Sequence, residues 1–139
     1  MGFRQAEEVI LPARFLTTVA HLVTVIAVLD GREYFVARSM GANGSYGKEN
    51  KQLEVMACVA LACLVVEFLG LLSGLTIFMR GLNCFHTFMH FFGAVLTWLF
   101  MEEHWKIDHY IPILVVFNGL PFLGEVLGIL AVGVLKLPL

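Results

Sequence analysis

Four long apolar runs, separated by polar segments, make up most of the chain. They cover residues 12–29, 55–79, 82–101 and 110–135. Apolar runs of about 18 or more residues are typical of membrane spans, because about 20 helical residues cross a hydrocarbon core of about 30 Å. No run alternates apolar and polar positions as a barrel strand does. The pattern predicts an all-α membrane protein, a four-transmembrane-helix bundle in one domain over residues 1–139.

The first run is the shortest of the four. The uninterrupted part is Phe15–Leu29, and Pro12 and Arg14 extend it to spanning length. Pro12 suits the first turn of a helix, where its missing N–H costs nothing. We expect the Arg14 guanidinium to reach back to the lipid headgroups. Because no small-residue cleavage site follows, we expect this helix to be retained.

The connections between the runs differ in length. Residues 30–54 form one longer polar loop with a glycine-rich tip, whereas Arg80–Gly81 predicts a tight hairpin and residues 102–109 a short acidic loop. Aromatic residues around the short loop predict an aromatic belt at one membrane interface: Trp98, Phe100, Trp105 and Tyr110.

The predicted orientation in the membrane depends on one motif. Arginine and lysine residues are nearly balanced between the two sides, so the positive-inside rule does not decide. Asn43-Gly44-Ser45 is a possible N-glycosylation sequon in the long loop. Its use at Asn43 requires the long loop to be outside, which predicts that both termini are cytoplasmic.

Composition agrees with a membrane protein and excludes several functional classes. The chain is 59% hydrophobic and 14% charged, compared with about 25% charged residues in a soluble domain. The net charge is −2, with no basic stripe, so we expect no nucleic-acid binding. Cys58, Cys63 and Cys84 lie inside apolar runs, which predicts packing residues rather than a disulfide framework.

Each apolar run carries a few polar or small residues at helical spacing. A carboxylate near the bilayer centre costs about a few kcal/mol and tends to face other helices. If both termini lie on one side, the acids and histidines fall at similar depths. We therefore predict a polar seam inside the bundle. Its members are Glu67, Glu125, His21, His90, Gly70, Gly74, Gly128 and Asn118.

Several chemistries are open to this seam. His86 and His90 have the i, i+4 spacing of a helical metal-ligand pair. His21 and His90 could ligate a haem axially, and a buried Glu with a His could couple proton movement to transport. The simplest interpretation is structural, with the polar groups bonded to each other to fix helix register. We therefore expect no metal and no cofactor.

Small residues and a proline predict local helix geometry. Gly70 and Gly74 are four residues apart, as are Gly124 and Gly128, and each pair lies beside a Glu. This spacing lets helix backbones approach, so we expect the second and fourth helices to pack together. Proline near the middle of the last helix frees a carbonyl one turn earlier, which Asn118 is placed to satisfy.

No catalytic signature is present in the sequence. Ser73 has no histidine near it on its own helix, and the chain has no glycine-rich phosphate loop. The polar loops are too short for a separate catalytic domain. We therefore expect that the protein is not an enzyme and has no small-molecule substrate.

Several short motifs occur in order along the chain. They are Leu11–Leu16 with Ala20–Val23, Glu67–Gly70 with Leu72–Gly74 and Phe78, His90 with Phe100–Trp105, Leu120–Pro121 with Glu125, and Gly133–Lys136. In this combination the chain resembles the transmembrane protein 107 family, small four-span ciliary proteins. The loop 30–54 does not match, and Lys136 stands alone where the family pattern has several lysines.

The resemblance implies a function that does not follow from the residues alone. It implies a non-enzymatic component of the ciliary transition zone that supports cilium assembly and the diffusion gate at the cilium base. The implied partners are the lipid bilayer, other transition-zone membrane proteins, tectonic-type proteins and B9-domain proteins. The alternative from the polar seam is a small proton-coupled transporter or a haem-binding membrane redox protein.

Overall fold

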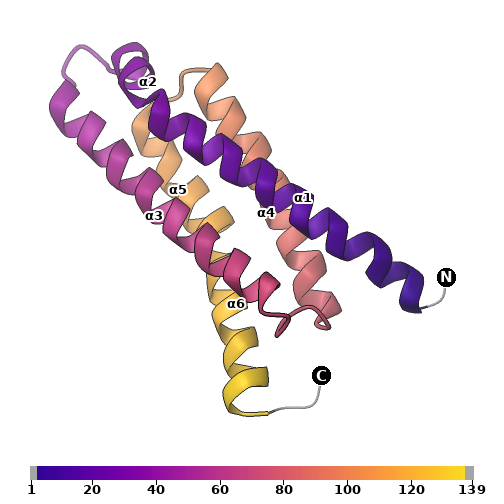
Figure 1. Ribbon diagram of the computed structural model, residues 1–139. Coiled ribbons are helices and arrows are strands. Elements are labelled where there is room, and N and C mark those ends of the chain that lie inside the picture. Colours follow the sequence, from indigo (N-terminus) through magenta and orange to yellow (C-terminus); the bar gives the residue numbers. More distant parts are fainter. Residues whose placement is uncertain (1–2, 137–139) are drawn as a thin grey trace.

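The computed structural model describes residues 3–136 and is a bundle of four long helical segments (Figure 1). All four are long and apolar enough to cross a membrane, which confirms the predicted all-α four-helix membrane fold. The four long segments are α1 (Phe3–Asp30), α3 (Tyr46–Leu72), α4 (Arg80–Glu102) and a composite last segment. That segment contains η1 (Ile107–His109), α5 (Tyr110–Leu114), η2 (Val115–Gly119), α6 (Leu120–Ile129) and η3 (Leu130–Val134). A short helix, α2 (Arg32–Ser39), lies between α1 and α3.

The long helices pack so that both ends of the described chain lie at the same end of the bundle (Figure 1). Helix α1 packs along α4 and also contacts α3, while α6 contacts both α3 and α4. The short helix α2 packs on α3 at the opposite end. The connection from α3 to α4 therefore lies at the same end as the two termini.

The start of α1 differs from the sequence prediction. The helix begins at Phe3, so Pro12 lies inside it rather than in its first turn. The preceding residues include Arg4, Glu7 and Glu8, which are polar but favour a helix. Hydropathy marks the apolar span, and the helix continues beyond it. The longest connection is again between the first two spans, but it contains α2.

The predicted second span, 55–79, is also placed differently. Helix α3 runs over Tyr46–Leu72, and residues 73–79 form a compact non-helical connection to α4. Gly74 has a φ of +78°, a conformation that glycine adopts without steric cost. The expected hairpin at Arg80–Gly81 is wrong, because α4 already begins at Arg80. The connection is apolar in composition, so hydropathy alone does not separate it from the helix.

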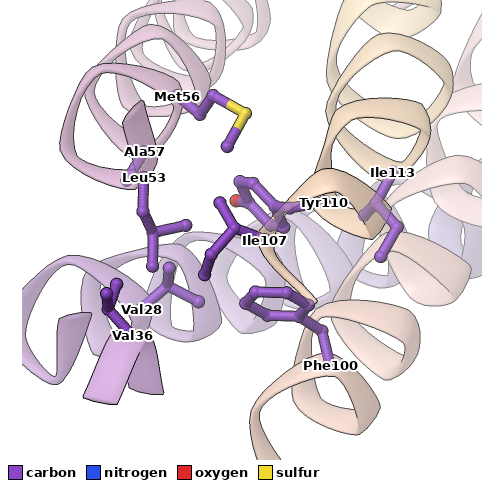
Figure 2. Close-up of a cluster of buried hydrophobic side chains, with 9 residues drawn as sticks. All are labelled: Val28, Val36, Leu53, Met56, Ala57, Phe100, Ile107, Tyr110 and Ile113. Atoms are coloured by element: carbon purple, nitrogen blue, oxygen red, sulfur yellow. The ribbon is translucent and has the colours of Figure 1, made fainter. Parts of the chain in front are cut away.

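A cluster of buried apolar side chains fills the end of the bundle near α2 (Figure 2). Phe100 and Tyr110 are part of it, and their ring centroids are 5.1 Å apart. The aromatic belt prediction is therefore wrong for these two residues, because both face inward across the short α4–η1 connection. Trp98, in contrast, is 52% exposed. The members are Val28, Val36, Leu53, Met56, Ala57, Phe100, Ile107, Tyr110 and Ile113.

The last segment adapts to its proline by a local change in helix type. The π-helical turn η2 ends at Gly119, and Pro121 lies at the start of α6, where its missing N–H is tolerated. Asn118 lies in this turn and is fully buried, but neither polar atom of its side chain has a hydrogen-bond partner. The expected bond from Asn118 to a freed carbonyl is not formed.

Loss of the Phe100 ring should destabilise the bundle strongly, since Phe100 is only 1% exposed in the apolar cluster. We expect Phe100→Ala to lower the free energy of unfolding by about 3–5 kcal/mol. Phe92→Ala, at a position that is 49% exposed, is the matched control and should have a small effect. Denaturant unfolding of both variants in detergent micelles tests this, and equal losses would contradict the packing.

Candidate functional site

The buried polar side chains lie mainly in the other half of the bundle, near the termini and the α3–α4 connection. Arg14 of α1 is at the centre of this group and is only 1% exposed. Its Nη2 atom donates to Oε2 of Glu125 in α6 at 2.7 Å. Its Nη1 atom donates to Oδ1 of Asn83 at 2.5 Å and to Oγ1 of Thr76 at 3.3 Å. One guanidinium thus joins α1, α4, α6 and the α3–α4 connection.

The α3–α4 connection is held in place by the same polar group. Thr76, which is fully buried, donates to Oε1 of Glu125 at 2.7 Å. The Asn83 side-chain amide donates to the backbone carbonyl of Ile77 at 2.6 Å. These bonds explain why an apolar segment without helical structure can lie at the end of α3, since its polar groups have partners inside the protein.

The expectation that Arg14 reaches the headgroups is wrong. The buried stripe of α1 runs through Arg14, Thr18 and His21 and continues through Val25 and Val28. These positions follow the i, i+4, i+7 spacing of one helix face, so Arg14 points into the bundle. This spacing was a usable signal in the sequence, but the acceptor, Glu125, is 111 residues away along the chain.

A second polar group lies against the first and contains three predicted seam residues, Glu67, His90 and His21, from three different helices. Oε2 of Glu67 in α3 is 2.6 Å from Nε2 of His90 and 3.2 Å from Nδ1 of His86, both in α4. His90 Nδ1 is 3.1 Å from Nδ1 of His21 in α1. His86 Nε2 is 3.5 Å from Oε2 of Glu125. The two acids and three histidines therefore form one continuous buried chain across four helices.

Several atoms of this second group are close together without hydrogen-bond geometry. Both carboxylate oxygens of Glu67, both ring nitrogens of His86, and Nε2 of His90 have no hydrogen-bond partner. Among the residues that the structure describes, Glu67 forms ion pairs with histidine alone, whereas Glu125 is paired with Arg14. Buried polar atoms without partners are costly, so this group requires a specific explanation.

Glycines allow the helices to approach at these polar groups. A side chain at Gly70 would overlap the Glu125 carboxylate, so Gly70 lies where α3 and α6 pack together. A Cβ atom at Gly93 would lie 2.6 Å from the His21 ring, a role that no sequence motif indicated. Gly128 faces Leu82 and Thr76.

The remaining predicted residues lie outside the polar cluster. Gly74 is in the α3–α4 connection rather than on a helix face. Asn118 is buried but makes no hydrogen bond with its side chain. Asn43 is exposed in the connection between α2 and α3, where its side chain is accessible for modification.

The geometry does not fit the haem hypothesis. Axial ligation needs the two histidine nitrogens on opposite faces of a porphyrin. The Nδ1 atoms of His21 and His90 are only 3.1 Å apart, and the two rings are in direct contact. No space for a macrocycle lies between them.

The Arg14–Glu125 pair should be essential for folding because removal of one partner leaves an uncompensated buried charge. We expect Arg14→Met to lower the free energy of unfolding by about 3–5 kcal/mol. The double variant Arg14→Met with Glu125→Gln should recover a large part of this loss. Thermal unfolding of the wild-type chain and these variants in detergent tests both expectations. Glu7→Gln, in the half-exposed Glu7–Arg80 pair, is the control, with an expected effect of about 1 kcal/mol or less.

The chain is similar to a set of known membrane proteins along most of its length. The sequence model of the TMEM107 family, described as a transmembrane protein, matches residues 10–129. Transmembrane protein 107 of Mus musculus is 30% identical over 130 residues, which cover 91% of this chain and 93% of the relative. The Homo sapiens protein of that name is 30% identical, with coverages of 84% and 85%.

A third relative gives the same result. Transmembrane protein 107 of Xenopus laevis is 29% identical over 126 residues, covering 88% of this chain and 90% of the relative. No solved structure matches the chain. The family match spans parts of all four helical segments, including the buried Arg14–Glu125 pair and the histidine cluster. The chain therefore belongs to the transmembrane protein 107 family.

Proposed function

We propose that this protein is a non-enzymatic membrane scaffold of the ciliary transition zone, where it supports cilium assembly and the diffusion gate at the cilium base. The observation that carries the proposal is membership of the transmembrane protein 107 family over residues 10–129. The ciliary role in this proposal is the one that the motif resemblance to that family implies. The fold is compatible with it, because the described residues form spans and short connections without a separate aqueous domain.

The distribution of polar and apolar groups supports a scaffold. The buried acids, histidines and Arg14 contact one another inside the bundle. The outward faces are apolar, with exposed side chains on every span. Such faces can contact lipid and also helices of other membrane proteins. Examples are Leu16, Val65, Leu69, Phe88, Phe91, Leu123 and Leu127.

The partners in this proposal are those implied by the family resemblance. They are the lipid bilayer, other transition-zone membrane proteins, tectonic-type proteins and B9-domain proteins. Both termini are cytoplasmic in the proposed orientation, and the exposed Asn43 lies on the opposite side. Cytoplasmic partners would then meet the termini and the α3–α4 connection.

A proton-coupled transporter is the competing function that the buried chain of acids and histidines favours. Glu67 contacts both His86 and His90, and His90 contacts His21, so ionisable groups link three helices. Replacement of Glu67 by Gln removes a proton acceptor and keeps the size and a hydrogen-bonding end. This single variant separates a structural role from a proton-carrying one.

Localisation in ciliated cells that lack their own family member tests the scaffold function. We expect the wild-type chain and Glu67→Gln to reach the cilium base and restore cilia. Gly70→Leu should fail, because its side chain would displace the Glu125 carboxylate between α3 and α6. Gly133→Leu is the control, since a Cβ there meets open space. If Gly70→Leu restored cilia and Glu67→Gln did not, the scaffold proposal would be wrong.

The orientation has its own test in intact cells. We expect tags at both termini to be stained only after the plasma membrane is permeabilised. We also expect glycosidase treatment to shift the mass of the wild-type protein and leave Asn43→Gln unchanged. Staining of terminal tags on unpermeabilised cells would show the opposite orientation, with both termini outside the cell.

A further inference from the structure

Three side chains of metal-ligand type meet at one buried point between α3 and α4. They are Glu67, His86 and His90, and their ligand atoms all lie within 4.8 Å of one another. None of the three is more than 1% exposed. The i, i+4 spacing places both imidazoles on one face of α4, and the carboxylate enters from α3.

The atoms of these residues that would bind a metal have no hydrogen-bond partner. Both Glu67 oxygens, Nδ1 of His86 and Nε2 of His90 are buried and unpartnered. From this convergence we propose that Glu67, His86 and His90 bind one divalent transition-metal ion of the Zn²⁺ class. This proposal goes beyond the scaffold function and holds independently of where in the cell the protein acts.

The second ring nitrogen of each histidine ligand is also placed as a metal site requires. A histidine that binds metal through one nitrogen usually donates its other N–H to a nearby acceptor. His90 directs Nε2 to Glu67, and its Nδ1 is 3.1 Å from Nδ1 of His21. His86 directs Nδ1 to Glu67, and its Nε2 is 3.5 Å from Oε2 of Glu125. Both imidazoles therefore have an outer partner on the side away from the metal.

Neutral histidines beside an ionised Glu67 carboxylate do not explain the same geometry. If neutral His86 donated from Nδ1 to Glu67, its Nε2 lone pair would face Glu125 Oε2, which is also an acceptor. A metal on Nδ1 leaves the proton on Nε2, where it points at that carboxylate. The competing occupant is a proton, either on Glu67 Oε2, from which it is donated to Nδ1 of neutral His86, or as a second proton on His86. A metal titration distinguishes both from a metal ion.

The ligand set and the charges select the kind of ion. Two imidazoles and one carboxylate suit Zn²⁺ and similar transition metals rather than Ca²⁺ or Mg²⁺, which prefer all-oxygen sites. Arg14 offsets Glu125 through their 2.7 Å ion pair, so Glu67 provides the remaining negative charge. Three protein ligands leave a fourth tetrahedral position for water or hydroxide.

Two of the three ligand separations can be compared with those around a tetrahedral ion. Tetrahedral ligands with bonds of about 2.1 Å lie about 3.4 Å apart. The 3.2 Å separation of Glu67 Oε2 and His86 Nδ1 is close to this value, whereas the 2.6 Å separation from His90 Nε2 must widen. Rotation of the Glu67 carboxylate can provide the difference, because Oε1 is also unpartnered.

Metal titration of the purified full chain in detergent tests the site. After EDTA dialysis, we expect about one Zn²⁺ per chain, and Co²⁺ should give the visible absorption of a tetrahedral nitrogen–oxygen site. Glu67→Gln and His86→Asn should weaken Zn²⁺ binding by at least about 100-fold, and His21→Asn by about 10–100-fold. His109→Asn, at an exposed position, is the matched control and should bind as the wild type does.

Two results would overturn the proposal. One is the absence of stoichiometric Zn²⁺ and Co²⁺ binding by the folded wild-type chain, which would leave a proton as the occupant. The other is unchanged affinity in Glu67→Gln and His86→Asn. If these variants fail to fold, X-ray absorption of the Zn²⁺-loaded wild-type chain decides instead. Two imidazoles and at least one oxygen ligand are expected, and any other histidine count would exclude this ligand set.

Discussion

A single buried ion pair between Arg14 and Glu125 connects the first helix of the chain to the last. Both side chains are almost completely excluded from solvent, and their 2.7 Å contact lies within a segment that would cross the bilayer. Unpaired, either charge would be costly there, so the pair constrains how the helices can be arranged. Asn83 and Thr76 accept further hydrogen bonds from the guanidinium, so Arg14 also holds α4 and the α3–α4 connection in place.

The bundle has two chemically different halves, and the Arg14–Glu125 pair lies in the polar one. Near the termini, packing is governed by directed polar contacts, with glycines at positions 70 and 93 giving the space that Glu125 and His21 occupy. Near α2, packing is apolar and depends on shape, with Phe100 and Tyr110 among the packed side chains (Figure 2). Polar contacts specify which helix faces meet, and the apolar cluster fills the volume between them. A scaffold for other membrane proteins would benefit from helices fixed in this way.

Hydropathy is sufficient to predict that there are four spans, because a run of about 20 predominantly apolar residues has the length of a helix across a bilayer. It also indicated that Glu67, Glu125, His21 and His90 face inward, since a charged group at that depth is costly against lipid. Other features were not visible in hydropathy. The end of α3 at Leu72 depends on a left-handed Gly74 and on internal hydrogen bonds to an apolar connection.

Which polar groups pair depends on the packing of the whole bundle. Arg14 lies near the end of its apolar run, where a headgroup contact was the simplest prediction, and its acceptor is 111 residues away. The same holds for Glu67, whose contacts with His86 and His90 depend on the rotation of α3 against α4. Helical spacing fixes which residues share a face of one helix. The relative rotation and depth of different helices arise from packing of the whole bundle, and these set which side chains touch.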